Sequence, residues 1–116
     1  MLKEAKKALR VTVNNFDSEI ASLLMAGAND LQIAGVVLPG TVTFTIGTND
    51  AVTDVSTLTD ALAMRAVITY AQMRFGNPPN WQQLADSYDM QKVQLMHASA
   101  YTDYGDGGED DGDGEG

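Results

Sequence analysis

Residues 60–76 read DALAMRAVITYAQMRFG, and this stretch decides the fold because apolar side chains occupy almost all of it. Between Ala61 and Met73 the polar residues form only a narrow stripe at helical spacing. A helix that is apolar nearly all round lies in the middle of a protein rather than on its surface. The stretch therefore predicts a central helix running to Phe75, and we expect Leu62 to lie in the core. The polar stripe consists of Arg65, Thr69 and Gln72.

The residues before this helix predict a β-hairpin and a helix start. Residues 41–46 alternate strictly between Thr and an apolar residue, which is typical of a strand with one buried face. Residues 47–50, GTND, are a turn sequence, and a second strand can follow. A lone two-stranded ribbon is marginally stable in water, so we expect the hairpin at about 41–55 to contact a partner without being needed for folding. Thr57 and Asp60 loosely match a capping box.

Two further helices are predicted upstream of the hairpin. The first, residues 2–10, is too short to persist alone and must pack on the rest of the chain. The second runs over about 16–34, begins at a cap supplied by Asn14-Asn15, and ends at Gly35. Gly27 lies in its middle, where glycine costs up to about 1 kcal/mol relative to alanine. We therefore expect a neighbouring helix to approach closely there.

A fourth helix is predicted after residues 76–80, GNPPN, which combine stop, turn and cap residues. This helix runs over about 81–98. One of its apolar faces can pack inward, and a second apolar line exceeds what a monomer of this size needs, so we expect a contact between subunits there. One side carries Trp81, Leu84, Tyr88 and Leu95, and the second line carries Met90, Val93 and Met96.

Charge is concentrated at the C-terminal end of the 116-residue chain, whose formal net charge is −9. Residues 103–116 hold seven of the 16 Asp and Glu, six of the 11 Gly and no Lys or Arg. Such a segment is too hydrophilic to fold, so it is either a solvated tail or an acidic arm that docks on a basic partner. The predicted fold is mainly α: a four-helix bundle over 1–102 with an inserted hairpin between helices 2 and 3, followed by a disordered acidic tail.

Several classes of site are excluded by residues that the sequence lacks. Without Cys, no disulfide framework, thiolate zinc site or cysteine nucleophile can form. With one His, no transition-metal site can be assembled, and no glycine cluster resembles a phosphate-binding loop. We therefore predict no enzyme activity, cofactor or metal. The charged N-terminal segment argues against a signal peptide, and no apolar run spans a membrane, so synthesis in the cytoplasm is expected.

Three weaker candidates for chemistry are better explained as ordinary surface. His97, with Ser99 nearby, suits a helix end, where a partial positive charge is favourable. Asp86 and Asp89 lie three residues apart on one helix, which is typical of a solvated face rather than of an acid/base pair. A calcium loop starting at Asp111 would need ligands out to its twelfth position, and the chain reaches only the sixth.

Basic residues line one face of the predicted first helix. They recur at the i, i+3, i+4 and i+7 spacing that places side chains together. Such a stripe can contact phosphate without reading base sequence, although a solvated face has the same pattern and the net charge of −9 disfavours tight DNA binding. The residues are Lys3, Lys6, Lys7 and Arg10.

Three segments together resemble the small head–tail connector (adaptor, or DNA-packaging) proteins of tailed bacteriophages. The start, LKEAKKALRV followed by NNFDSEI, is similar to their opening, and MRAVITYAQMRFG is similar to their central helix. YDMQKVQL with AYTDYG resembles their last helix and exit. The resemblance covers most of residues 1–35 and 58–105, and it is lost at 36–56 and in the tail. The matching positions include Tyr70, Phe75, Gly76, Tyr88, Asp89, Leu95, Tyr101 and Tyr104.

The resemblance implies a four-helix subunit that assembles into a ring, often dodecameric, beneath the portal protein of the DNA-filled head. Such a ring extends the DNA channel, lets DNA pass transiently and docks the stopper or tail-completion protein, which places the chain in the virion with no membrane contact. The alternative is a small helical DNA-binding accessory protein that uses the basic first helix. The candidate interface residues are Lys3, Lys6, Lys7, Arg10, Val42, Phe44, Ile46, Met90, Val93, Met96, Tyr101 and Tyr104.

Overall fold

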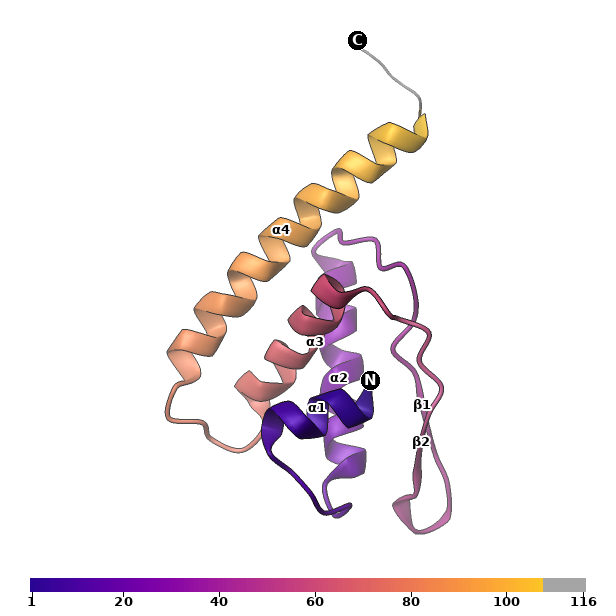
Figure 1. The fold of residues 1–116 in the computed structure, drawn as a ribbon, viewed down its shortest axis with the longest axis vertical. Coiled ribbons are helices and arrows are strands. Elements are labelled where there is room, and N and C mark those ends of the chain that lie inside the picture. The colour runs from indigo at the N-terminus through magenta and orange to yellow at the C-terminus, as the bar shows by residue number, and fades with distance from the viewer. Residues whose placement is uncertain (108–116) are drawn as a thin grey trace.

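The fold is mainly helical, with a hairpin between the second and third helices, as the sequence predicted (Figure 1). The computed structural model describes the backbone of residues 1–107 and the side chains of residues 1–97. Its two strands are antiparallel and pair Phe44 with Asp54 and Ile46 with Val52. The described elements are α1 (Leu2–Leu9), α2 (Asp17–Ile33), β1 (Phe44–Ile46), a 3-10 turn (Thr48–Asp50), β2 (Val52–Asp54), α3 (Ala61–Arg74) and α4 (Trp81–Gly107).

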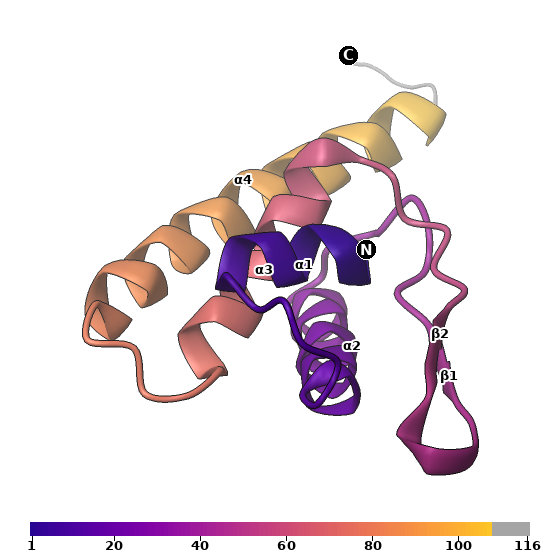
Figure 2. The ribbon, with the colours of Figure 1, turned by 60° about the horizontal axis from the view of Figure 1, so that its bottom comes forward.

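Helix α3 is the centre of the molecule, because it packs against α1, α2 and α4 (Figures 1 and 2). Val67 is fully buried and Ala63, Ala66 and Ala71 are buried beside it, which confirms the predicted central helix. Leu62 is 37% exposed, so its predicted place in the core is wrong. A helix that is apolar on nearly every side shows no period from which its outward residues can be recognised.

Thr69 also departs from the prediction, because it is buried rather than part of an exposed polar stripe. Its hydroxyl donates a hydrogen bond of 2.8 Å to the backbone carbonyl of Arg65, one turn earlier in α3. A threonine that satisfies its hydroxyl on its own helix can be buried without losing a hydrogen bond.

The helix starts differ from those expected from capping residues. Asp60 itself is the N-cap of α3, and its Oδ2 accepts from the backbone N–H of Ala63 at 2.9 Å. The expected Thr57 cap is wrong, because the Thr57 hydroxyl accepts from the Thr41 N–H at 2.8 Å across the hairpin base. Helix α2 begins after Phe16 without a side-chain cap, since Asn14 instead accepts from Lys6 Nζ at 2.9 Å.

Helix α2 approaches α3 closely at Gly27. A Cβ placed there would lie 3.1 Å from the Cβ and ring carbons of Tyr70, tighter than most real Cβ contacts. This confirms the predicted close approach and explains a glycine in mid-helix. Gly35, with a φ of 102°, follows the end of α2 in a conformation that glycine adopts without strain.

The base of the hairpin belongs to the core, while its turn extends away from the helices (Figure 2). Phe44 is buried with Val36 and Leu58, whereas Ile46, two residues closer to the turn, is 48% exposed. The strands are shorter than predicted, and the burial of Phe44 argues against a hairpin that folding does not need. The alternation was interpreted correctly as a strand, but only its first part has a buried face.

Helix α4 is longer than predicted, because it continues past residue 98 to Gly107. The predicted start of the tail at 103 therefore falls inside α4, and residues 108–116 lie outside the described part. Its last turns extend beyond the other elements in both views (Figures 1 and 2). Among the described residues, no helix is both long and apolar enough to cross a membrane.

Candidate interaction surfaces

Helix α1 and the residue that follows it present three exposed cations, Lys3, Lys7 and Arg10. The fourth member of the predicted stripe, Lys6, is half-buried, and its Nζ lies 2.8 Å from Asp17 Oδ1 at the start of α2. Lys6 therefore ties α1 to α2. The basic face available to a partner is smaller than the sequence pattern indicated.

A groove runs between α1 and β2, with a cavity volume of about 690 Å³. Apolar side chains form much of its surface, and the basic residues of α1 lie along one side. The hairpin supplies the opposite side through Val52 and Asp54. The lining residues are Leu2, Lys3, Lys6, Lys7, Arg10, Val11, Thr12, Val52 and Asp54.

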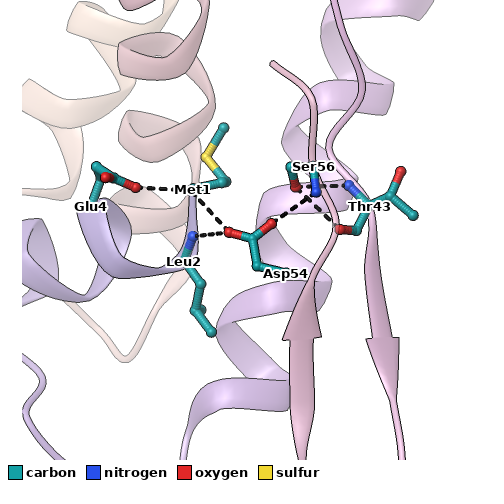
Figure 3. A network of polar contacts seen from close by, with 6 residues as sticks. All are labelled: Met1, Leu2, Glu4, Thr43, Asp54 and Ser56. Carbon is teal, nitrogen blue, oxygen red and sulfur yellow. Dashed lines mark hydrogen bonds and ion pairs between the residues drawn. The ribbon is translucent and has the colours of Figure 1, made fainter. Parts of the chain in front are cut away.

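Asp54, one of the lining residues, holds the hairpin against the start of α1 (Figure 3). Its Oδ2 accepts from the backbone N–H of Leu2 at 2.9 Å and lies 2.9 Å from the Met1 ammonium, which also pairs with Glu4 at 2.8 Å. Its Oδ1 accepts from the Ser56 N–H at 3.0 Å. Leu2 and Asp54 are 52 residues apart, so no local pattern could have predicted this contact.

These hydrogen bonds and ion pairs shift the pKa of the Asp54 carboxyl and of the Met1 ammonium. Burial raises the pKa of Asp54, but hydrogen bonds from Leu2, Ser56 and the ammonium outweigh burial and hold that pKa well below its usual range. Burial lowers the pKa of the Met1 ammonium, but hydrogen bonds and charge attraction from Glu4 and Asp54 more than offset it and raise that pKa. Both groups are therefore charged at neutral pH.

A second surface is the outward apolar line on α4. Met90 is 66% exposed, Val93 50% and Met96 38%, whereas Tyr88 and Leu95 on the same helix are buried. A shallow hollow of about 330 Å³ lies at Met90 and Val93. Helix α4 thus has one apolar face that packs inward and a second that no described part of the chain covers.

The inward face of α4 is fixed to α2 by a cluster that sequence reasoning missed. The Tyr88 hydroxyl donates to Asp30 Oδ2 at 2.5 Å, and Lys92 Nζ lies 3.5 Å from the same oxygen. Lys92 Nζ also lies 5.1 Å from the centroid of the Tyr88 ring. Burial, followed by the bond to Asp30, raises the pKa of Tyr88, so its hydroxyl stays protonated.

The remaining interface candidates lie in different environments. Val42 is half-buried and Phe44 is buried within the chain, so of the three hairpin candidates only Ile46 offers an exposed side chain. Tyr101 and Tyr104 lie in the part of α4 whose side chains are outside the described residues. The ten candidates whose side chains the structure describes therefore do not lie in one patch.

The candidates for catalysis do not come together in the described part of the chain. His97 is exposed near the end of the described side chains, and Ser99 lies beyond them. Asp86 accepts from Gln82 Nε2, one turn earlier on α4, at 3.1 Å, and Asp89 is exposed. Within the described residues, no three His, Cys, Asp or Glu side chains are grouped as metal ligands would be.

Comparison with known proteins identifies a family over the helical part of the chain. The model of the family described as phage connector protein matches residues 1–102, which span α1 to most of α4. The chain belongs to the phage connector protein family. This family is one of structural proteins, so the surfaces of this connector are the features relevant to its function. Neither a curated protein nor a solved structure matches the connector chain.

Proposed function

We propose that this connector is a head–tail adaptor subunit that forms a ring under the portal protein of the virion. The observation that carries the proposal is the family match over residues 1–102, which includes every helix of the bundle. In this role the ring extends the DNA channel and presents a docking surface to the stopper or tail-completion protein. The chain needs no cofactor, metal or catalytic activity for such a task.

The outward face of α4 supports a contact between subunits of the ring. Burying an exposed Met or Val side chain contributes about 1.5–3 kcal/mol, so covering Met90 and Val93 would stabilise an assembly. The hollow beside them offers a neighbouring side chain a place to insert. A modest net charge of −2 over residues 1–102 also suits a channel wall past which DNA slides without sticking.

The test is co-assembly with the portal ring of the same phage, followed by negative-stain imaging and mass measurement. We expect a ring of this protein on the portal, and Val93→Asp should weaken it because it places a charge in the subunit contact. Gln83→Asp, at an exposed polar position of the same helix, is the matched control. An unchanged portal without added density would refute the proposal.

The DNA-binding alternative keeps one specific observation in its favour, the exposed cations Lys3, Lys7 and Arg10 on α1. If they neutralise three phosphates, the logarithm of the binding constant should fall with the logarithm of salt concentration with a slope of about −2.7. Retention of duplex DNA with that slope, lost when all three become Ala, together with no portal binding, would favour this alternative.

A further inference from the structure

We propose that the groove between α1 and β2 receives the acidic C-terminal segment, residues 101–116, of a second copy of this chain. The inference rests on the proposed function, because the groove supplies, together with the outward face of α4, the contact that joins one ring subunit to the next. The groove and the segment are different surfaces of the subunit, so the contact is head-to-tail, and a head-to-tail contact with a suitable rotation closes into a ring.

The groove combines an apolar floor with a basic side. Leu2, Val11 and Val52 supply apolar surface, and the exposed cations of α1 lie beside them. Its volume of about 690 Å³ lies within the range of sites that enclose a ligand. Asp54 also lines the groove, but the Met1 ammonium 2.9 Å away offsets its negative charge. The occupant therefore needs both apolar groups and negative charge.

The C-terminal segment has this composition. Residues 101–116 read YTDYGDGGEDDGDGEG and contain two Tyr, seven acidic residues and no Lys or Arg. Tyrosine is enriched among the residues that anchor protein interfaces, and the acids complement the cations of α1. Duplex DNA would supply negative charge alone, which leaves the apolar floor uncovered.

The shape of the subunit favours docking between two copies. Helix α4 extends past the end of the bundle, while α1 and the hairpin, whose residues line the groove, lie away from its tip (Figures 1 and 2). The start of the segment is therefore directed away from its own groove and toward the space that a neighbour would occupy.

Direct binding is tested with a fluorescein-labelled peptide of residues 101–116, titrated with full-length protein and followed by fluorescence anisotropy. The protein carries Asn or Gln in place of Glu109, Asp110, Asp111, Asp113 and Glu115, so its own segment competes less strongly with the peptide. We expect saturable binding that weakens as salt rises. Lys7→Glu should weaken it by about tenfold or more, because a charge is reversed inside the groove. Arg65→Glu, on α3 and outside the groove lining, is the matched control and should leave binding unchanged.

Two outcomes of this titration would overturn the proposal: no saturable binding up to about 1 mM peptide, a concentration that corresponds to only weak affinity, or equal binding by the Lys7→Glu and Arg65→Glu proteins. A peptide with Tyr101→Ala and Tyr104→Ala tests the apolar part, and we expect weaker binding at every salt concentration. Stronger retention of a duplex oligonucleotide than of the peptide at equal salt would assign the groove to nucleic acid instead.

The direction of docking is tested by mixing two full-length variants. One has a reversed groove (Lys3→Glu, Lys7→Glu, Arg10→Glu) and the other a reversed segment (Glu109→Lys, Asp110→Lys, Asp111→Lys). Each alone should be monomeric in ultracentrifugation, and a mixture should form one-to-one pairs, because one intact groove meets one intact segment. Failure to pair would overturn docking between copies. A wild-type contact between groove and segment that is independent of protein concentration would do the same, because such a contact lies within one molecule. Portal binding by the same variants is scored separately, so a connector that still binds the portal would retain the proposed function while losing this inference.

Discussion

Asp54 shows how one carboxylate joins parts of the chain that no local pattern connects. It links the end of β2 to the first residues of α1, and Ser56 extends the link to β1 by donating to the Thr43 carbonyl at 3.1 Å. Because the pKa of Asp54 is lower in the folded protein, its contribution to stability depends on pH.

The direction of the pKa shift of Asp54 determines whether the protein gains or loses stability as pH falls. A carboxyl with a depressed folded pKa stabilises the protein above its unfolded pKa of about 3.9, and the stabilisation is lost as pH falls below that value. We predict that Asp54→Asn lowers the free energy of unfolding by about 1–2 kcal/mol at pH 6. In urea titrations the gap from wild type should shrink progressively below about pH 4.

Asp50→Asn in the hairpin turn is the control for this measurement. Asp50 is exposed in the hairpin turn and has a φ of 59°, which Asn also tolerates. Its effect should be small at every pH. A constant gap for Asp54→Asn between pH 6 and pH 3 would show that the carboxylate does not act through its charge.

Val67 and Leu62 lie on the same helix, α3, but differ in burial. Val67→Asp should lower the free energy of unfolding by several kcal/mol, since it puts an unpaired charge at a fully buried position. A single domain has about 5–15 kcal/mol in total, so this variant should melt far below wild type. Leu62→Asp, at a position that is 37% exposed, should cost much less. Equal melting temperatures for the two variants in circular dichroism would contradict the assignment.

At the scale of elements, the hairpin divides into a structural base and an exposed end. Phe44→Ala should cost about 3–5 kcal/mol because it empties a buried site beside Val36 and Leu58. Ile46→Ala, two residues along the same strand, should change stability by less than about 1 kcal/mol. Chemical denaturation of both variants measures the contrast, and similar losses would mean that the strand is buried along its whole length.

Regular periodicity made most elements predictable. The alternation of residues 41–46 indicated a strand, and Gly27 indicated where α2 and α3 approach. What could not be predicted depends on contacts between distant residues. Thr57 fails as a cap because Thr41 engages its hydroxyl, and Tyr88 meets Asp30, 58 residues away. The candidate site was predictable only as separate stripes, since the groove requires α1 and β2 to be brought together by the fold.

For the whole molecule, the C-terminal acids should affect charge rather than stability. Truncation after Gly107 removes five acidic residues and changes the formal net charge from −9 to −4. Segments without apolar anchors contribute little to folding, so at low protein concentration we expect a melting temperature within about 2 °C of wild type. Assembly at low salt should change, and the change should fade as salt screens charges beyond about 8 Å. A large drop in melting temperature would instead mean that the segment packs on its own bundle.

The length of α4 makes the position of its far end sensitive to how the helix packs on the bundle. Its 27 residues extend about 40 Å, and Gly107 lies twelve residues, about 18 Å along the helix axis, beyond the buried Leu95. A tilt of about 10° at the Tyr88 and Leu95 anchor moves the tip by about 3 Å, close to the width of one atom contact. A change of one side chain at the anchor is therefore magnified at the tip. The position of a protein bound at that tip would then depend on how α4 packs on the bundle.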